Sequence, residues 1–190
     1  SDRGATQTAG DVSADAEALA FLCAVNQAEI DAAKTAKEKG VSGGALEFAN
    51  MMQRDHYDNT QKTLDLATRT GVKPAETDKI VQLKNFAKWD LGNLVMAPAG
   101  QADQAYMASQ ARAHAMVLQM LDQDILPRVQ NADIKAHVQQ SRDKVADHLK
   151  MASGSGQGMQ GSPGNQGMQG GAPRSESPMP TSTPPGGGRS

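Results

Sequence analysis

The sequence predicts an all-α protein, a four-helix bundle made of two helical hairpins with a long, partly helical connection. Three observations support this prediction. Apolar and small residues recur at alternating spacings of three and four along four long segments, which is the period of a buried helix face. Glycines stand near the ends of those segments, where helices commonly stop. The 190 residues include only three Phe, two Tyr and one Trp, fewer aromatics than a sheet core usually contains.

Local signals define the expected helices. Ser13 or Asp15 provides an N-terminal cap for the first helix, and Gly40 and Gly71 end the first two. Gly92 and the Pro98–Gly100 stretch are expected to break the connection between the hairpins. The expected helices span 13–39, 45–70, 78–91, 101–127 and 133–151.

Composition divides the chain into a flexible N-terminus (1–12), a four-helix domain (13–152) and a disordered tail (153–190). The tail holds 11 of the 19 Gly and 6 of the 9 Pro, and no Leu, Ile, Val or aromatic residue. Such a segment buries too little apolar surface to offset the entropy lost on ordering. The tail is therefore read as low-complexity chain, with a role as a tether to an envelope partner as the alternative.

Charge and cysteine content exclude several classes of protein. With 19 Lys and Arg against 21 Asp and Glu, the net charge of −2 argues against nucleic-acid binding. The longest apolar run, 18–25, is too short to span a bilayer, so no transmembrane segment is expected. A single cysteine, Cys23, excludes an intramolecular disulfide and is expected to be a small core residue.

Four side chains on the predicted core faces are strong metal ligands. Each long helix contributes one of them, and they are Glu29, His56, His114 and His148. Glu29 and His56 are equally distant from the turn at Ser42-Gly43, and His114 and His148 from Asn131, so each hairpin presents a level pair to its interior. Three imidazoles and one carboxylate suit one divalent transition metal such as Zn, Cu or Fe.

The residues around this set are expected to orient the ligands. Asn26 and Gln110 lie one helical turn from Glu29 and His114 and are placed to hydrogen-bond the outer ring nitrogens. Asp55 and Asp147 directly precede two of the histidines and are expected beside the ligands or on the surface. His137 is off the core face and is expected to be exposed. The alternative is a metal-free polar layer that only fixes helix register.

Four short patterns in this order resemble one bacterial family. They are Asn26-x-x-Glu29, Met52-x-x-Asp55-His56, Tyr106-Met107 followed by His114, and Val145-x-x-His148-Leu149. The family is one of unknown function, labelled "predicted outer membrane protein" and placed in the ferritin-like superfamily. The resemblance covers roughly residues 15–152 and implies an exported four-helix fold. It also implies that Glu29, His56, His114 and His148 occupy the polar positions that recur in the family.

The sequence departs from the di-iron members of that superfamily, because it contains no Glu-x-x-His. An oxidase or ferroxidase is therefore not expected, and an enzyme is the less favoured reading. We expect an exported, periplasmic protein that binds one transition metal for sequestration or stress protection. The chain carries neither an initial Met nor a signal peptide, which indicates a processed or trimmed form. The alternative is a structural or interaction module of the cell envelope, and a redox-metal oxidoreductase ranks third.

Overall fold

The computed structural model describes residues 12–158, and those residues form helices and connecting turns with no strand. The all-α prediction is therefore confirmed. The elements in chain order are α1 (Ala14–Glu38), α2 (Gly43–Thr70), α3 (Asp78–Met96), α4 (Ala102–Met120), η1 (Leu121–Ile125), η2 (Leu126–Arg128) and α5 (Ala132–Gly158).

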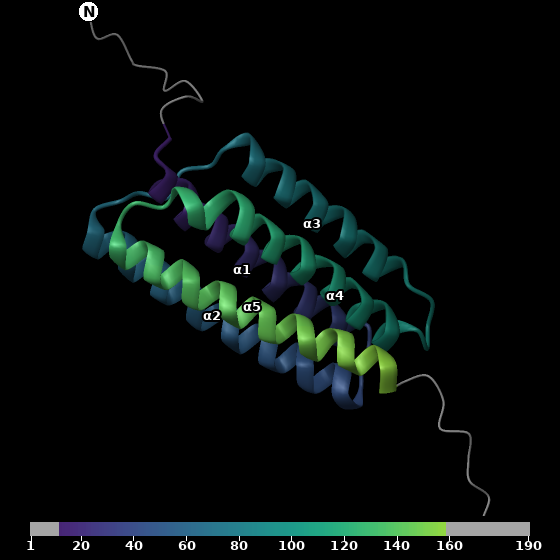
Figure 1. Ribbon diagram of the computed structural model, residues 1–190. Coiled ribbons are helices and arrows are strands. Elements are labelled where there is room, and N and C mark those ends of the chain that lie inside the picture. Colours follow the sequence, from purple (N-terminus) through teal and green to yellow (C-terminus); the bar gives the residue numbers. More distant parts are fainter. Residues whose placement is uncertain (1–11, 159–190) are drawn as a thin grey trace, which may run out of the picture. The chain divides into compact units, whose positions relative to one another are not determined.

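Four long helices form the bundle, and α3 packs on its outside (Figure 1). α1 pairs with α2, and α4 pairs with α5, as expected for two helical hairpins. α3 contacts α1 and α4. The connection between the hairpins is thus a helix that covers one side of the bundle, opposite the seam between α2 and α5.

Helix ends follow the predicted signals where a side chain or a glycine satisfies them. Ser13 is the N-cap of α1, and its hydroxyl accepts a hydrogen bond from the Ala16 amide at 3.1 Å. Gly71 ends α2 with φ of 71°, in the left-handed region that favours glycine.

Three helix boundaries differ from the prediction by more than two residues. α3 continues through Gly92 to Met96, because one interior glycine costs only about 1 kcal/mol and the burial of Leu83 and Leu94 on either side offsets it. α4 ends at Met120, short of Pro127. A π-helical turn and a short 3-10 turn follow, since a proline cannot donate to the helix ladder and clashes with the preceding turn.

The third difference concerns the start of the tail. Residues 153–158 continue α5, six positions beyond the predicted end of the domain at residue 152. Each added residue gains one backbone hydrogen bond at the end of an existing helix. The remainder of the predicted tail, 159–190, and nearly all of the predicted flexible N-terminus, 1–11, lie outside the described residues.

The core is divided into two apolar clusters by a polar layer. One cluster contains Leu19, Phe21 and Ile134, and the other contains Met52 and Tyr106. On every long helix the layer lies between the two clusters, and its buried members include Asn26, Glu29, His56, Gln110, His114 and His148. Cys23 is half-buried rather than a full core residue, and burial raises the pKa of its thiol.

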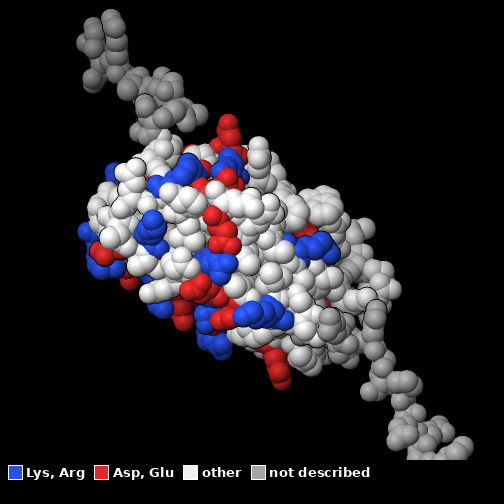
Figure 2. All heavy atoms as spheres, viewed as in Figure 1, with Lys and Arg blue, Asp and Glu red and all other residues white. Residues whose placement is uncertain are grey.

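The surface is mixed in charge. On the face shown in Figure 2, Lys and Arg are interspersed with Asp and Glu, and no broad basic patch forms. This face therefore offers no broad basic surface of the kind that binds nucleic acid. None of the helices in this part of the chain combines the length and apolar character that crossing a bilayer requires.

Candidate metal centre

Three histidine rings meet in the polar layer. His56 on α2, His114 on α4 and His148 on α5 are all buried, and one ring nitrogen of each lies within 4.8 Å of one ring nitrogen of each of the others. The ring centroids are 5.4 to 6.1 Å apart. Three nitrogens bound to one Zn²⁺ lie about 3.3 Å from each other, so small ring rotations would bring these three onto one ion.

The outer nitrogen of His56 is held by a chain of side-chain hydrogen bonds. His56 Nδ1 lies 2.8 Å from Asn26 Oδ1, and an amide oxygen only accepts, so Nδ1 donates. Asn26 Nδ2 donates to Asn59 Oδ1 at 2.9 Å, and Asn59 Nδ2 donates to Ser141 Oγ at 2.8 Å. This chain links α1, α2 and α5, and it fixes both the orientation of the Asn26 amide and the tautomer of His56.

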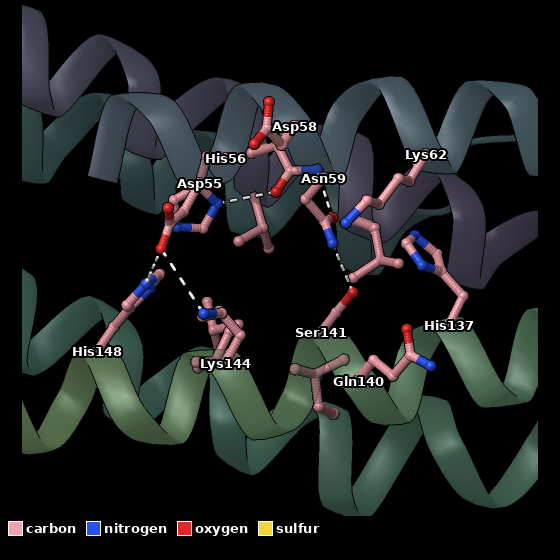
Figure 3. A pocket seen from close by; sticks show the side chains of 16 residues that line it. Asp55, His56, Asp58, Asn59, Lys62, His137, Gln140, Ser141, Lys144 and His148 are labelled. Atoms are coloured by element: carbon pink, nitrogen blue, oxygen red, sulfur yellow. Dashed lines mark hydrogen bonds and ion pairs between the residues drawn. The ribbon is translucent and has the colours of Figure 1, made fainter. Parts of the chain in front are cut away.

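Each of the other two rings also donates one ring N–H to an oxygen acceptor. His114 Nδ1 donates to the backbone carbonyl of Gln110 at 2.9 Å. His148 Nε2 donates to Asp55 Oδ2 at 3.2 Å, across the seam between α2 and α5 (Figure 3). A carbonyl and a carboxylate both accept, so each ring keeps its proton on the outer nitrogen.

The inner nitrogens are consequently three lone pairs without a donor. His56 Nε2, His114 Nε2 and His148 Nδ1 are buried, and none has a hydrogen-bond partner among the described residues. Leaving one buried acceptor unsatisfied costs about 1–3 kcal/mol, and here three converge. An electrophile at the centre of the cluster would satisfy all three lone pairs.

Burial favours the neutral form of two of these rings, His56 and His148. The pKa of His56 is well below its usual value because burial disfavours the charged ring, and His114 and His148 add further repulsion. The pKa of His148 is also lowered by burial, although the hydrogen bond to Asp55 opposes the shift. Neutral imidazole is the form that ligates a metal.

Glu29 lies beside the cluster and not in the group of converging ligand atoms. Its Oε1 is 3.8 Å from His114 Nδ1, the nitrogen that faces the Gln110 carbonyl. The turn between α1 and α2 is centred earlier than the Ser42-Gly43 position assumed from the sequence, since α1 ends at Glu38 and α2 begins at Gly43. Asn26, one turn before Glu29, therefore stands level with His56.

A second set of unsatisfied polar atoms surrounds Glu29. Its Oε2, the Gln110 Oε1 and the Tyr106 hydroxyl are buried without hydrogen-bond partners in the described part of the chain. Burial raises the pKa of Glu29, while the nearby His114 and the side chain of Gln110 lower it by smaller amounts. Burial and Glu29 together raise the pKa of Tyr106.

The other predicted residues differ from one another in their contacts and their exposure. Asn26 and Asp55 contact histidines of the cluster through their side chains, whereas Gln110 contacts His114 through its backbone carbonyl. Asp147 is exposed and pairs with Lys150 at 3.7 Å, because its direction on α5 is away from the core. His137 is half-buried and not exposed, and its Nε2 lies 2.9 Å from the Thr63 hydroxyl.

Two residues were missed by the sequence reasoning. Asn59 joins Asn26 to Ser141, and its place one helical turn after His56 is the signal that could have found it. Tyr106 shares one face of α4 with Gln110 and His114 at spacings of four residues, which is an equally readable signal.

A groove of about 270 Å³ leads from the surface to the cluster between α2 and α5 (Figure 3). His56 and His148 line its inner end, while His114 lies beyond them. The histidine cluster is therefore buried but has a solvent-facing approach.

The fold and the cluster together define the class of protein: an all-α bundle whose buried polar layer brings three histidines together. The chain belongs to the family described as a "Domain of unknown function (DUF4142)", which matches residues 1–154. This confirms the assignment to a family of unknown function made from the sequence patterns. No curated protein and no solved structure matches the chain.

Proposed function

We propose that this protein binds one divalent transition metal through His56, His114 and His148, and that it sequesters the metal or protects against metal stress. The observation that carries the proposal is the set of three buried ring nitrogens that face each other without a donor. Imidazole nitrogens are ligands for Zn²⁺, Cu²⁺ and Fe²⁺, and three of them with an open fourth position form a recurrent metal site.

The residues around the rings support the same proposal. A metal-binding histidine normally donates its second ring N–H to a carboxylate, an amide oxygen or a backbone carbonyl. All three types of acceptor are present here, one for each ring, from Asp55, Asn26 and Gln110. In this proposal Glu29 stands behind His114, and its carboxyl tunes the charge around that ring.

The proposed role is storage rather than redox turnover at a di-iron centre. The sequence has no Glu-x-x-His, the motif that carries ligands of ferritin-like di-iron centres, and the converging group consists of three imidazoles. The proposal includes membership of the ferritin-like superfamily and export to the periplasm, both expected from the sequence resemblance. Fractionation of the native host, with the protein followed by antibody, tests the compartment.

Metal content of the full chain tests the proposal. The protein is purified without chelator, refilled with Zn²⁺, Cu²⁺ or Fe²⁺ in turn, and assayed by elemental analysis. We expect about one tightly held ion per chain, lost in His114→Ala and retained in His137→Ala, a histidine outside the cluster. Far-UV circular dichroism confirms that each variant folds. Metal content at background in the wild type would overturn the proposal.

A structural role for the polar layer is the second candidate. The chain from His56 through Asn26 and Asn59 to Ser141 crosses three helices, which is what a register-fixing network requires. Under this alternative a chelator leaves the melting temperature unchanged, whereas metal binding predicts a lower melting temperature after chelation.

A further inference from the structure

The groove between α2 and α5 is a second binding feature beyond the three histidines. Its inner end is formed by His56 and His148, whose unpartnered nitrogens are buried and belong to the cluster. Its floor is apolar and comprises Leu22, Val25, Val117, Leu121 and Val145. A metal at the cluster would therefore be approached past two imidazoles and over an apolar surface.

The charges around the groove favour an anionic occupant once a metal is bound. The three imidazoles contribute no negative charge, so a divalent ion would keep both of its positive charges. At the rim, Lys62 and Lys144 stand against Asp55 and Asp58. Asp55 is already engaged by His148 at 3.2 Å and faces Lys144 at 3.9 Å, while Lys62 forms no ion pair among the described residues.

A hydrogen-bond donor completes the lining. Ser141 is buried and accepts from Asn59 Nδ2, which leaves its own hydroxyl proton without an acceptor in residues 12–158. Ser141 lines the groove about two helical turns from His148 on α5, so this donor lies away from the histidine cluster.

We infer that the groove binds a small organic monocarboxylate whose carboxylate occupies the open metal position and whose apolar body lies on the floor between α2 and α5. The inference rests on the proposed metal site. Lys62 adds a favourable charge at the rim, and the volume of about 270 Å³ accommodates a single aromatic ring.

Benzoate and acetate are suitable probes, because they share the carboxylate and differ in the apolar body. Calorimetric titrations into full-length protein carrying one Zn²⁺ should show benzoate binding at least about tenfold more tightly than acetate, since only benzoate buries a ring on the floor. Zinc-free protein should bind benzoate at least about tenfold more weakly than zinc-loaded protein.

Two variants sharpen the test. Val145→Phe places a ring in the groove and should abolish benzoate binding while zinc remains bound. Lys62→Gln should weaken benzoate severalfold, and Lys150→Gln, an exposed lysine on α5 outside the groove, should leave benzoate affinity unchanged. The comparison of benzoate with acetate in the wild type needs no variant and stands even where Val145→Phe misfolds.

The outcomes separate the two proposals. Bound zinc with equal affinity for benzoate and acetate overturns the groove inference and leaves the metal site standing. Tight benzoate binding that ignores the presence of zinc also overturns it. Failure to bind zinc overturns the metal proposal and this inference together.

Discussion

Asn26 is the residue whose removal tests the polar layer most sharply. Its side chain is 2% exposed and makes two hydrogen bonds, one accepted from His56 Nδ1 at 2.8 Å and one donated to Asn59 at 2.9 Å. In Asn26→Ala the buried His56 N–H loses its acceptor, while the half-buried Asn59 can reach water. The loss is therefore dominated by His56.

The magnitude follows from that single orphaned donor. Leaving a buried polar group unsatisfied costs about 1–3 kcal/mol, so we expect the free energy of unfolding to fall by about 2 kcal/mol. For a protein of this size the melting temperature should fall by about 4–8 °C. Without Asn26 nothing holds the orientation of the His56 ring, so Zn²⁺ affinity should fall by about 10–100-fold.

Urea unfolding of the metal-free protein measures the first effect, and a competitive zinc titration with a chromophoric chelator measures the second. Asn93→Ala, an exposed asparagine on α3, is the matched control and should change the unfolding free energy by less than about 0.5 kcal/mol. An unfolding free energy for Asn26→Ala equal to that of the wild type would refute the reasoning about the hydrogen-bonded layer.

Three further predictions concern pH, a buried carboxylate and two glycines. Folding lowers the pKa values of His56, His137 and His148, so the unfolded chain binds more protons than the folded chain below pH 6.5. The free energy of unfolding of the metal-free protein should therefore fall as the pH falls below that value, and it should fall less steeply in His56→Phe. The raised pKa of Glu29 opposes part of this loss. Urea midpoints across pH check this, and a flat profile would contradict it. Arg128→Ala should lower the free energy of unfolding by about 1–3 kcal/mol, because it removes the cation that pairs with the buried Glu17 carboxylate. Lys150→Ala, at an exposed ion pair, should lower it by less than about 0.5 kcal/mol. Equal shifts in melting temperature for the two variants would argue against this account. Gly92→Ala should stabilise α3 by about 0.5–1 kcal/mol, since a Cβ there meets nothing within 4 Å. Gly71→Ala should destabilise the protein, because φ at this residue is 71°. Melting temperatures that shift in the same direction in both variants would count against the helix assignment.

The core and the meeting of the histidines were predictable from the sequence because both depend on helix periodicity. A 3-4 alternation places Leu19, Leu22, Asn26 and Glu29 on one face of α1, and all four are buried. The same periodicity places His56, His114 and His148 in the interior at similar heights, and their ring nitrogens converge.

The contacts of individual side chains in the layer depend on helix offsets, rotamers and tertiary packing, which helix periodicity does not determine. Whether Asn26 or Glu29 stands level with His56 depends on a shift of less than one helical turn in the α1–α2 connection. Which acceptor each ring nitrogen meets depends on side-chain rotamers, so the backbone role of Gln110 and the bridging role of Asn59 appear only in three dimensions. The continuation of α3 through Gly92 reflects tertiary packing that outweighs local propensity.

X-ray absorption spectroscopy of the zinc-loaded full chain tests the central claim most directly. It counts and identifies the ligands of the bound ion. Three imidazole nitrogens at about 2.0–2.1 Å with one additional oxygen ligand are the predicted result. A coordination sphere of oxygen alone, or one with sulfur at about 2.3 Å from Cys23, would contradict the assignment of the metal to His56, His114 and His148.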